Sequence, residues 1–315
     1  MLIATESAVY TLGTSSGGER PEPSFEGTGI RRVAEERNGA VVAFSDGTVR
    51  LPAEGGGRTV AIDGEQTLHS LLILNEDPRE VLVGTEPPHI YRLTGTEAER
   101  LKAFDDLECR DGWHTPWGGS PAVRSMGRTG DGWVYADIHV GSIMRSSDRG
   151  GSWEPVTPEL HKDVHQVATC PATDERVYAQ TARAFYISED RGRSWIHRAE
   201  DLGERYGRAV AVHPTDPDLV LCTVSDGPHG ENVHGELYRS EDAGRHWTHV
   251  AEGFPESTPE NIDTFHVAFA PDGSAWALVG NTLYAGGDRA TDWRAFWQAP
   301  ADIIMLASAR PDGGA

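Results

Sequence analysis

The sequence predicts an all-β fold, a seven-bladed β-propeller, from a motif that recurs along the chain and from the strand-like segments around it. The motif Ser-x-Asp-x-Gly-x-x-Trp begins at Ser146, Ser188 and Ser240, and a degenerate copy runs from Gly286 to Trp293. The copies begin 42, 52 and 46 residues apart. That period matches a four-stranded blade and is too long for a helical-hairpin repeat.

Seven segments of apolar or alternating residues are predicted to form the inner strand of each blade. They start near Arg31, His69, Ala122, His165, Arg208, His266 and Ile303. A second strand is expected about twelve residues later in most blades, as at Val81 and Val134. Seven starts indicate seven blades.

The seventh start, at residues 301–308, has too little sequence after it for its outer strands, whereas residues 2–4 and 8–12 form strands without an inner strand of their own. We therefore expect the two ends to share one composite blade. Such a blade closes the ring and covers sheet edges that would otherwise be exposed. Residues 1–315 are expected to form a single propeller domain, and a closed ring needs no second subunit, so we expect a monomer.

The repeated hairpin motif has a structural explanation. Its aspartate is expected to accept hydrogen bonds from backbone amides of the hairpin, and its glycine to adopt a backbone conformation that is costly for other residues. Its tryptophan is expected to pack between neighbouring sheets. Because these hairpins lie on the outer edge of each blade, we assign their aspartates no catalytic role.

The composition restricts the class of partner and the compartment. A formal net charge of −21 repels phosphate backbones, which argues against nucleic acid or an anionic membrane as the main partner. The first six residues lack the pattern of a secretory signal, and no apolar run approaches the length of a membrane span. Three widely spaced cysteines suggest neither a disulfide framework nor a metal motif. We expect an acidic cytoplasmic protein.

Three near-complete copies of the motif make the chain resemble the Asp-box, or BNR-repeat, propellers, which include sialidases, sortilin-type receptors and photosystem assembly factors. The resemblance covers most of residues 65–300. Segments such as residues 84–89, 113–119 and 164–167 further resemble a subgroup of prokaryotic propellers labelled sialidase-like. The chain lacks the Phe/Tyr-Arg-Ile-Pro segment of sialidases, so the resemblance does not imply sialidase activity.

The starts of the inner strands bring polar side chains to one end of the central channel, because equivalent positions of different blades converge there. These positions hold Arg31, His69, His165, Arg208 and His266. We expect Arg31 and Arg208 to bind a carboxylate or phosphate of a small anionic molecule through paired hydrogen bonds.

Three of these side chains are imidazoles from separate blades, and neutral imidazole is a ligand for Zn, Mn, Fe or Cu. The sequence therefore suggests His69, His165 and His266 as a site for a divalent transition metal. His139, His234 and Glu231 lie in loops before third strands and are candidates for the general acid or base. Two alternatives stay open: a polar pocket without metal, or side chains that line a hydrated channel.

Two loops are candidates for substrate contacts at the channel mouth. Trp113, His114 and Trp117 form an aromatic cluster in the loop that enters the third blade, with a rigid structural plug as the alternative. Glu86 and His89 flank the stiff Pro87-Pro88 pair. The carboxylates Glu86, Asp111, Asp137, Glu231 and Asp263 are also placed at the mouth.

Three functions are consistent with these patterns. The first is a binder of a small anionic molecule, which includes a metal-dependent hydrolase or lyase. The second is a non-catalytic scaffold with a protein partner. A glycoside hydrolase is the third and the least favoured, because it requires two carboxylates at a defined separation and the sequence singles out no pair.

Overall fold

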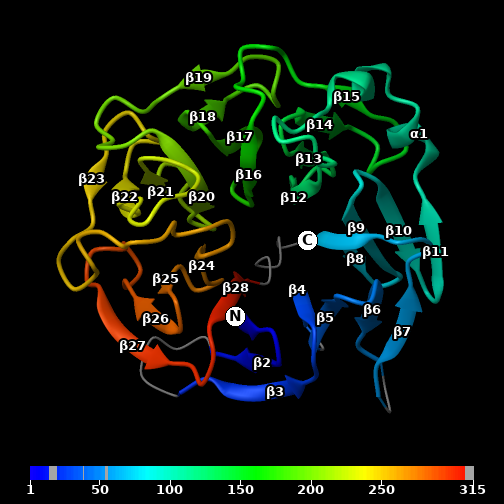
Figure 1. Cartoon of the computed structure of the whole chain (residues 1–315), viewed down its shortest axis with the longest axis horizontal. Helices are drawn as coiled ribbons and strands as arrows, with labels where there is room; N and C mark the ends of the chain where they lie inside the picture. The colour runs from blue at the N-terminus through cyan, green and yellow to red at the C-terminus, as the bar shows by residue number, and fades with distance from the viewer. Residues whose placement is uncertain (14–19, 38, 54–55, 309–315) are drawn as a thin grey trace.

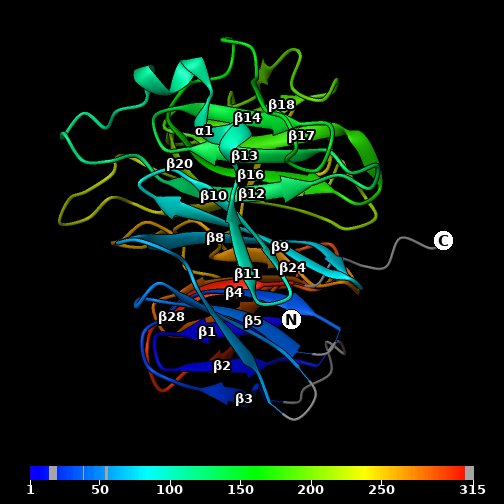
Figure 2. The same ribbon diagram turned by 90° about the vertical axis from the view of Figure 1, so that its right-hand side faces the viewer.

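The computed structural model describes residues 1–13, 20–37, 39–53 and 56–308. The described residues form seven four-stranded antiparallel sheets around a central axis (Figure 1), which confirms the predicted seven-bladed propeller. In the side view the strands run roughly along that axis (Figure 2). The inner strands of neighbouring blades contact one another around the ring. Within the same ranges, no helix is long and apolar enough to cross a membrane.

Blades are numbered here in chain order, and the blade that unites the two ends is called the closing blade. Blade 1 consists of β4 (Ile30–Glu36), β5 (Gly39–Phe44), β6 (Thr48–Leu51) and β7 (Arg58–Ala61). Blade 2 consists of β8 (Thr67–Glu76), β9 (Arg79–Glu86), β10 (Ile90–Thr94) and β11 (Glu97–Arg100). Blade 3 consists of β12 (Val123–Arg128), β13 (Val134–Ile138), β14 (Ser142–Ser146) and β15 (Glu154–Pro155). Blade 4 consists of β16 (Val164–Cys170), β17 (Thr173–Thr181), β18 (Ala184–Ser188) and β19 (Ile196–His197). Blade 5 consists of β20 (Tyr206–Val212), β21 (Val220–Ser225), β22 (Glu236–Ser240) and β23 (Thr248–His249). Blade 6 consists of β24 (Val267–Phe269), β25 (Ala275–Val279), β26 (Thr282–Ala285) and β27 (Arg294–Gln298). Between blades 2 and 3 lie the short helix α1 (Lys102–Asp105) and the 3-10 turn η1 (Glu108–Gly112).

The closing blade has the strand order β28-β1-β2-β3, with β28 (Ile303–Ala307), β1 (Leu2–Thr5), β2 (Ala8–Thr11) and β3 (Glu22–Glu26). β1 pairs with β28 in the register Leu2 with Ala307 and Ile3 with Leu306, and on its other side with β2. Alternate side chains of β1 face opposite neighbours. Ile3 packs in a cluster with residues of blade 6, and Leu2 in a cluster with residues of blade 1. The predicted composite blade is therefore confirmed.

The hairpin motif has the predicted local structure. Asp190 Oδ1 accepts a hydrogen bond of 2.8 Å from the backbone N–H of Ser194, and Ser188 Oγ accepts one of 2.7 Å from Gly192. Gly192 has a φ of 80°, which favours glycine. The tryptophan of the next copy, Trp247, packs edge-on against Phe185 of the preceding blade at 5.0 Å between ring centroids. Each motif thus stabilises its own turn and fills the space between two blades.

Arginines of the preceding blade add a contact that the repeat does not reveal. In each case a guanidinium donates to the backbone carbonyl of the residue after the motif's aspartate. The four pairs are Arg92 with Arg149, Arg145 with Arg191, Arg198 with Ala243 and Arg239 with Arg289. Neighbouring blades are therefore joined at their outer hairpins by hydrogen bonds as well as by apolar packing.

The motif aspartates should make stability depend on acidic pH. Burial acts to raise their pKa, but hydrogen bonds from the hairpin outweigh it and hold the pKa of Asp148 and Asp190 below the ordinary value and that of Asp242 at about 2. A carboxyl whose pKa is lower in the folded state adds stability above its unfolded pKa, about 3.9 for aspartate. That stability is lost as the pH falls through the folded pKa.

We expect Asp190→Asn to lower the melting temperature at pH 7 and to differ less from the parent protein as the pH falls from about 4 to about 2. Thermal melts followed by circular dichroism across this range provide the measurement. Asp302→Asn, which changes an exposed carboxylate between β27 and β28, is the control. The pH dependence of its melting temperature should be parallel to that of the parent. A constant difference between Asp190→Asn and the parent at every pH would contradict this explanation.

Candidate functional site

Four arginines meet at the end of the channel where the inner strands start. Arg31 and Arg32 lie on β4, Arg124 on β12 and Arg208 on β20. Burial and the neighbouring Arg31 lower the pKa of Arg32 to about 10, and burial also lowers the pKa of Arg124. We call this region, with the histidines and carboxylates described below, the funnel. Its positive charge is concentrated inside a protein of net charge −21.

Three of these guanidinium groups carry nitrogen atoms that are buried and have no hydrogen-bond partner among the described residues. They are Arg31 Nε, Arg124 Nη1 and Arg208 Nε. Arg208 is held at its other atoms: Nη1 lies 3.5 Å from Asp263 Oδ1, and the guanidinium lies over the Tyr206 ring at 5.0 Å. A buried donor without an acceptor is costly, so these atoms are available for an anionic ligand.

The carboxylates near the arginines only partly balance them. Burial acts to raise the pKa of Asp263, but Arg208 and His266 outweigh it and lower that pKa, so Asp263 is ionised. Asp137 on β13 is fully buried and accepts a hydrogen bond from Ser125 Oγ. Burial raises the pKa of Asp137 to about 7 in spite of the nearby Arg124. Asp137 is therefore only partly ionised at neutral pH.

A line of rings crosses the funnel from blade 3 to blade 5. Trp117 lies 5.2 Å from the His139 ring, His139 lies 6.0 Å from His165, and His165 lies 4.9 Å from Tyr206, measured between ring centroids. Trp117 is 67% exposed, whereas His165 is fully buried. The line thus leads from solvent at the rim to the buried floor beside Arg208.

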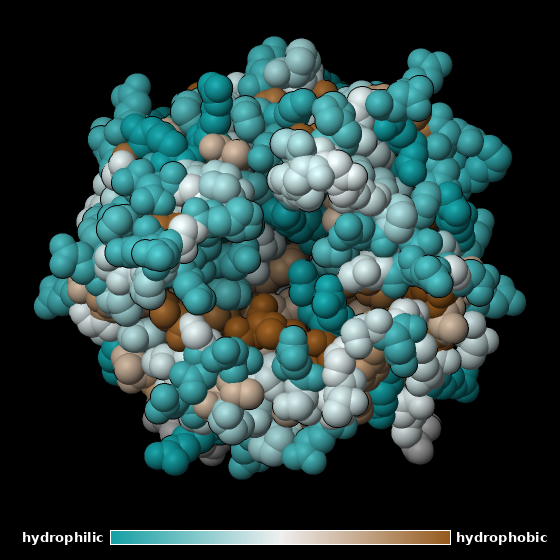
Figure 3. Space-filling model, viewed as in Figure 1, coloured by the Kyte–Doolittle hydropathy of each residue, from teal (hydrophilic) through white to brown (hydrophobic). Residues whose placement is uncertain are grey.

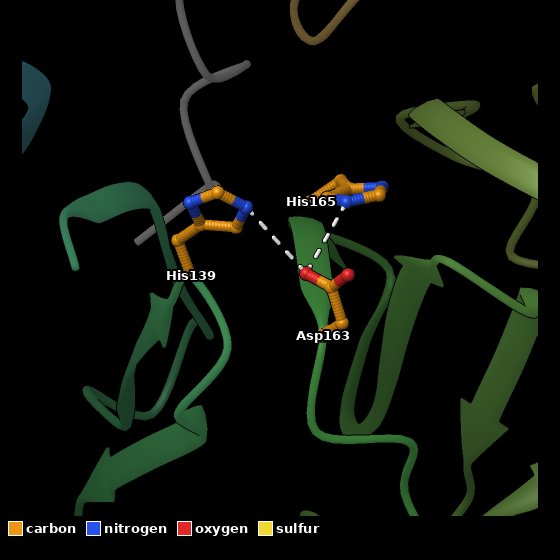
Figure 4. Close-up of side chains that lie close together, drawn as sticks. All are labelled: His139, Asp163 and His165. Carbon is orange, nitrogen blue, oxygen red and sulfur yellow. Dashed lines mark ion pairs between the residues drawn. The ribbon is translucent and has the colours of Figure 1, made fainter. Parts of the chain in front are cut away.

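Two of these histidines converge on Asp163, the residue before β16 (Figure 4). Asp163 Oδ1 lies 3.6 Å from His139 Nε2 and 3.3 Å from His165 Nε2. Burial and then Arg124 lower the pKa of His139 to about 3, and burial also lowers that of His165. Burial would raise the pKa of Asp163, but its interactions with His165 and His139 lower it. At neutral pH a carboxylate therefore faces two uncharged imidazoles.

The remaining funnel histidines have other partners. His69 Nε2 lies 3.0 Å from Glu86 Oε2, and burial with Arg32 and Arg31 lowers the pKa of His69 to about 3. His266 Nδ1 accepts a hydrogen bond of 3.1 Å from the Asp263 N–H, and burial lowers the pKa of His266 to about 4. The predicted trio of His69, His165 and His266 does not appear as a group of converging ligand atoms. Among the described residues, His139, Asp163 and His165 are such a group, with ligand atoms within 4.8 Å of one another.

Other predicted site residues have structural contacts or lie on exposed loops. His89 Nδ1 lies 2.7 Å from Asp105 Oδ1 beside α1. Trp113 is buried between blades 2 and 3, where it packs against Phe104, as expected of the plug alternative. The other three are exposed: His114 contacts its own loop, His234 pairs with Asp226, and Glu231 lies in the same loop as His234.

Four residues of the funnel were not among the predicted site residues: Arg32, Arg124, Asp163 and Tyr206. Arg124 could have been found, because it occupies in blade 3 the position that Arg31 and Arg208 occupy in theirs. Asp163 and His165 are two residues apart at a strand start, a spacing that puts side chains on one face. Tyr206 carries no such signal.

A cavity of about 850 Å³ occupies the deeper part of the channel, toward the ends of the inner strands. Arg32, Gln166 and Phe265 line it near the funnel, and apolar side chains such as Leu72 and Val210 line its wall. A hollow is visible at the centre of the ring in Figure 3, with hydrophobic and hydrophilic residues around it. The channel therefore has room for a ligand next to the charged groups.

Comparison with known families adds to this description. The family model Sortilin-Vps10, described as sortilin and neurotensin receptor 3, matches residues 141–301, which is just over half of the chain. The chain belongs to the Sortilin-Vps10 family. The segment that matches the Sortilin-Vps10 model includes Asp163, His165 and Arg208, whereas Arg31, Arg124 and His139 lie before it. No curated protein matches the sequence.

Solved structures similar to this Sortilin-Vps10 family member show its fold. An ancestral GH74 enzyme has a TM-score of 0.64 at 13% identity over 95% of this chain, which spans only 40% of that enzyme. YCF48 bound to a D1 peptide has a TM-score of 0.56 at 18% identity, over 85% of this chain and 81% of that one. The WD40 propeller domain of Doa1 has a TM-score of 0.58 at 15% identity, over 87% and 84%. The similar structures thus include an enzyme, a propeller bound to a peptide and a WD40 propeller domain.

Proposed function

We propose that the protein binds a small, multiply charged anion, a carboxylate or phosphate compound, in the funnel. The observation that carries the proposal is the set of buried guanidinium nitrogens of Arg31, Arg124 and Arg208 that lack a hydrogen-bond partner among the described residues. Three guanidinium groups from three blades fit an anion with several oxygens, because each group donates in a plane to two acceptors.

The electrostatics of the funnel support the same ligand. The charges of Arg31 and Arg124 act on Arg32 strongly enough to help lower its pKa. An anion between such groups relieves their mutual repulsion, and burial strengthens the attraction because the local dielectric is low. Asp137, with a pKa of about 7, can accept a proton as the pH falls, which leaves the funnel more positive below neutral pH.

Calorimetric titration with citrate and with inorganic phosphate tests this proposal. Arg124→Gln should weaken binding by about 10- to 100-fold, since a hydrogen bond to a charged group contributes about 1.5–3 kcal/mol. Arg245→Gln is the matched control, because Arg245 is 52% exposed on an outer hairpin. Equal affinity of the parent and Arg124→Gln for these anions, or no binding of either anion to the parent, would contradict the proposed anion pocket.

The same variant distinguishes a binding role from a structural one. Without ligand, Arg124→Gln removes a cation that is costly to bury and loses its attraction to Asp137 as well as its repulsion from Arg208, so its melting temperature should stay close to that of the parent. With saturating citrate the parent should become the more stable of the two. A large loss of stability without ligand would show that Arg124 serves the fold instead.

A peptide or protein partner is the second candidate. It is favoured by Trp117, a 67% exposed tryptophan at the rim of the funnel, and a similar propeller, YCF48, is seen with a D1 peptide. For this candidate, short peptides with a free terminal carboxylate should bind more tightly than citrate or phosphate. Trp117→Ser should then weaken peptide binding and leave small-anion binding unchanged.

A further inference from the structure

The group formed by His139, Asp163 and His165 joins two blades at the funnel wall (Figure 4). His139 directly follows β13 of blade 3, while Asp163 and His165 flank the first residue of β16 in blade 4. His165 is fully buried, and the side chains of His139 and Asp163 are 12% and 23% exposed. Both Nε2 atoms point to the same carboxylate oxygen, Asp163 Oδ1.

The hydrogen bonding of His165 determines which of its nitrogens can bind a cation. Its Nδ1 contacts the backbone carbonyl oxygen of Gly207. A carbonyl oxygen only accepts, so Nδ1 carries the proton and Nε2 of the neutral ring has a lone pair. Such a bond from the far nitrogen is the usual support of a metal-binding histidine. Nε2 then faces Asp163 Oδ1, which is buried and has no hydrogen-bond partner among the described residues.

An ordinary ion pair does not explain these distances. The other histidine–carboxylate pairs among the described residues have nitrogen-to-oxygen distances between 2.6 and 3.1 Å. They are His246 with Asp242 at 2.6 Å, His89 with Asp105 at 2.7 Å, His69 with Glu86 at 3.0 Å and His234 with Asp226 at 3.1 Å. Those values are typical of a hydrogen bond between a ring N–H and a carboxylate oxygen. The corresponding distances at Asp163, 3.3 Å to His165 Nε2 and 3.6 Å to His139 Nε2, are longer. At His165 the lone pair of Nε2 faces the carboxylate oxygen.

The longer distances fit a cation between the three side chains. Zn²⁺ binds imidazole nitrogen and carboxylate oxygen at about 2.0–2.2 Å, and a tetrahedron of that size separates its ligand atoms by roughly 3.3–3.6 Å. The two distances to Asp163 Oδ1 are in this range. All three ligand atoms lie within 4.8 Å of one another, so binding would require the two imidazoles to approach each other by at most about 1.2 Å. Two imidazoles also favour a transition metal over Mg²⁺ or Ca²⁺, which prefer oxygen ligands alone.

We propose that His139, Asp163 and His165 form a binding site for a divalent transition metal ion, Zn²⁺ in particular, with two nitrogen ligands and one oxygen ligand. Three protein ligands leave a fourth position for water or a ligand in the funnel. The Tyr206 hydroxyl lies 3.3 Å from His165 Nε2, and it would lose this contact when Nε2 binds the metal. The three ligands are distinct from the arginines of the anion pocket, although the charge of Arg124 acts on all three.

The experiment uses the whole chain without a histidine tag, stripped with a chelator and titrated with Zn²⁺. We expect one Zn²⁺ per chain by calorimetry and by elemental analysis after dialysis, and no competition from Mg²⁺. Asp163→Asn, which keeps size and shape, and His139→Gln should each weaken Zn²⁺ binding by more than about 100-fold, because even a supporting residue outside the ligand set costs 10- to 100-fold.

Two controls make the result specific. His246→Gln removes another imidazole paired with an aspartate, on an exposed outer hairpin, and should bind Zn²⁺ like the parent. Arg124→Gln should bind Zn²⁺ at least as tightly as the parent, because it removes a positive charge that acts on His139 and His165. Loss of the anion pocket and loss of the metal site can therefore be told apart. Melting curves of the variants without metal establish that they are folded.

Binding of Co²⁺ provides an independent readout, because a tetrahedral site with nitrogen ligands gives Co²⁺ a strong visible absorption that an octahedral aqueous ion lacks. Absorption in the parent and its loss in folded Asp163→Asn would support the proposal. Failure of the parent to bind Zn²⁺ at micromolar concentration, or equal binding by Asp163→Asn and His139→Gln, would overturn it.

Discussion

A variant that lacks residues 1–12 will show no single cooperative unfolding transition. The deletion removes β1 and β2, so β28 loses its partner within the closing blade and exposes an unpaired edge. It also removes Leu2 and Ile3, which connect the closing blade to blade 1 and blade 6 respectively. Calorimetry and circular dichroism melts provide the measurement. A melt identical to that of the full chain would show that the ring is held without the closing blade.

A point substitution tests the same contact in a chain that still folds. Ile3 is fully buried, and Ile3→Ala should lower the free energy of unfolding by about 2–5 kcal/mol through lost burial and the remaining cavity. Thr11→Ala, at an exposed position of the neighbouring strand β2, should stay within about 0.5 kcal/mol of the parent. Similar effects of the two substitutions would contradict the role assigned to β1.

Gly253→Ala will destabilise the protein strongly. Gly253 lies in the connection from β23 to β24 with a φ of +74°, and a Cβ placed on it would lie 1.8 Å from the backbone oxygen of Trp293. Trp293 belongs to the fourth hairpin motif, whose backbone would have to move. We expect a loss of about 2–6 kcal/mol, to which backbone strain and steric overlap contribute about equally. Chemical denaturation gives the free energy directly.

Substitutions at two other glycines distinguish the effect of backbone strain from that of steric overlap with Trp293. Gly95 has a φ of +63°, and no atom of the described residues lies within 4 Å of the point where a Cβ would be, so Gly95→Ala should cost only the backbone strain of about 1–2 kcal/mol. Gly112 does not have the left-handed conformation, and its Cβ would meet no close neighbour among the residues that the structure describes. Gly112→Ala should be near neutral or slightly stabilising. If Gly253→Ala and Gly95→Ala were equally destabilising, the overlap with Trp293 would not matter.

The local parts of the fold were predictable because they depend on residues close in sequence. The hairpin motif encodes its own turn through aspartate and glycine, and the spacing of the copies indicates the blade length. The closing blade followed from counting strands at the two ends. Strand β3 and helix α1 were not predicted, because their exposed or very short segments have no clear apolar period. The arginine contacts between blades depend on how two separate hairpins meet in space.

The sequence predicted where in the channel the candidate site lies better than it predicted which residues of the site contact one another. Equivalent strand positions correctly indicated that Arg31, Arg208, His165 and His69 share one end of the channel. They did not indicate which side chains point at one another, because this depends on each strand's twist and on the loops above it. His165 therefore lies close to Asp163 of its own blade and to His139 of the adjacent blade, while His69 lies close to Glu86. Whether a metal or an anion binds there stays a prediction for the experiments above.

The pairing of Leu2 with Ala307 has a consequence for protein synthesis. A ribosome adds about 5–20 residues per second, so β1 waits on the order of 15–60 s for its inner partner to emerge. During that time its apolar side chains have no final place in the structure. Long-range pairing of this kind slows folding and favours association with other chains. A nascent chain of this protein should therefore bind general chaperones until β28 is made.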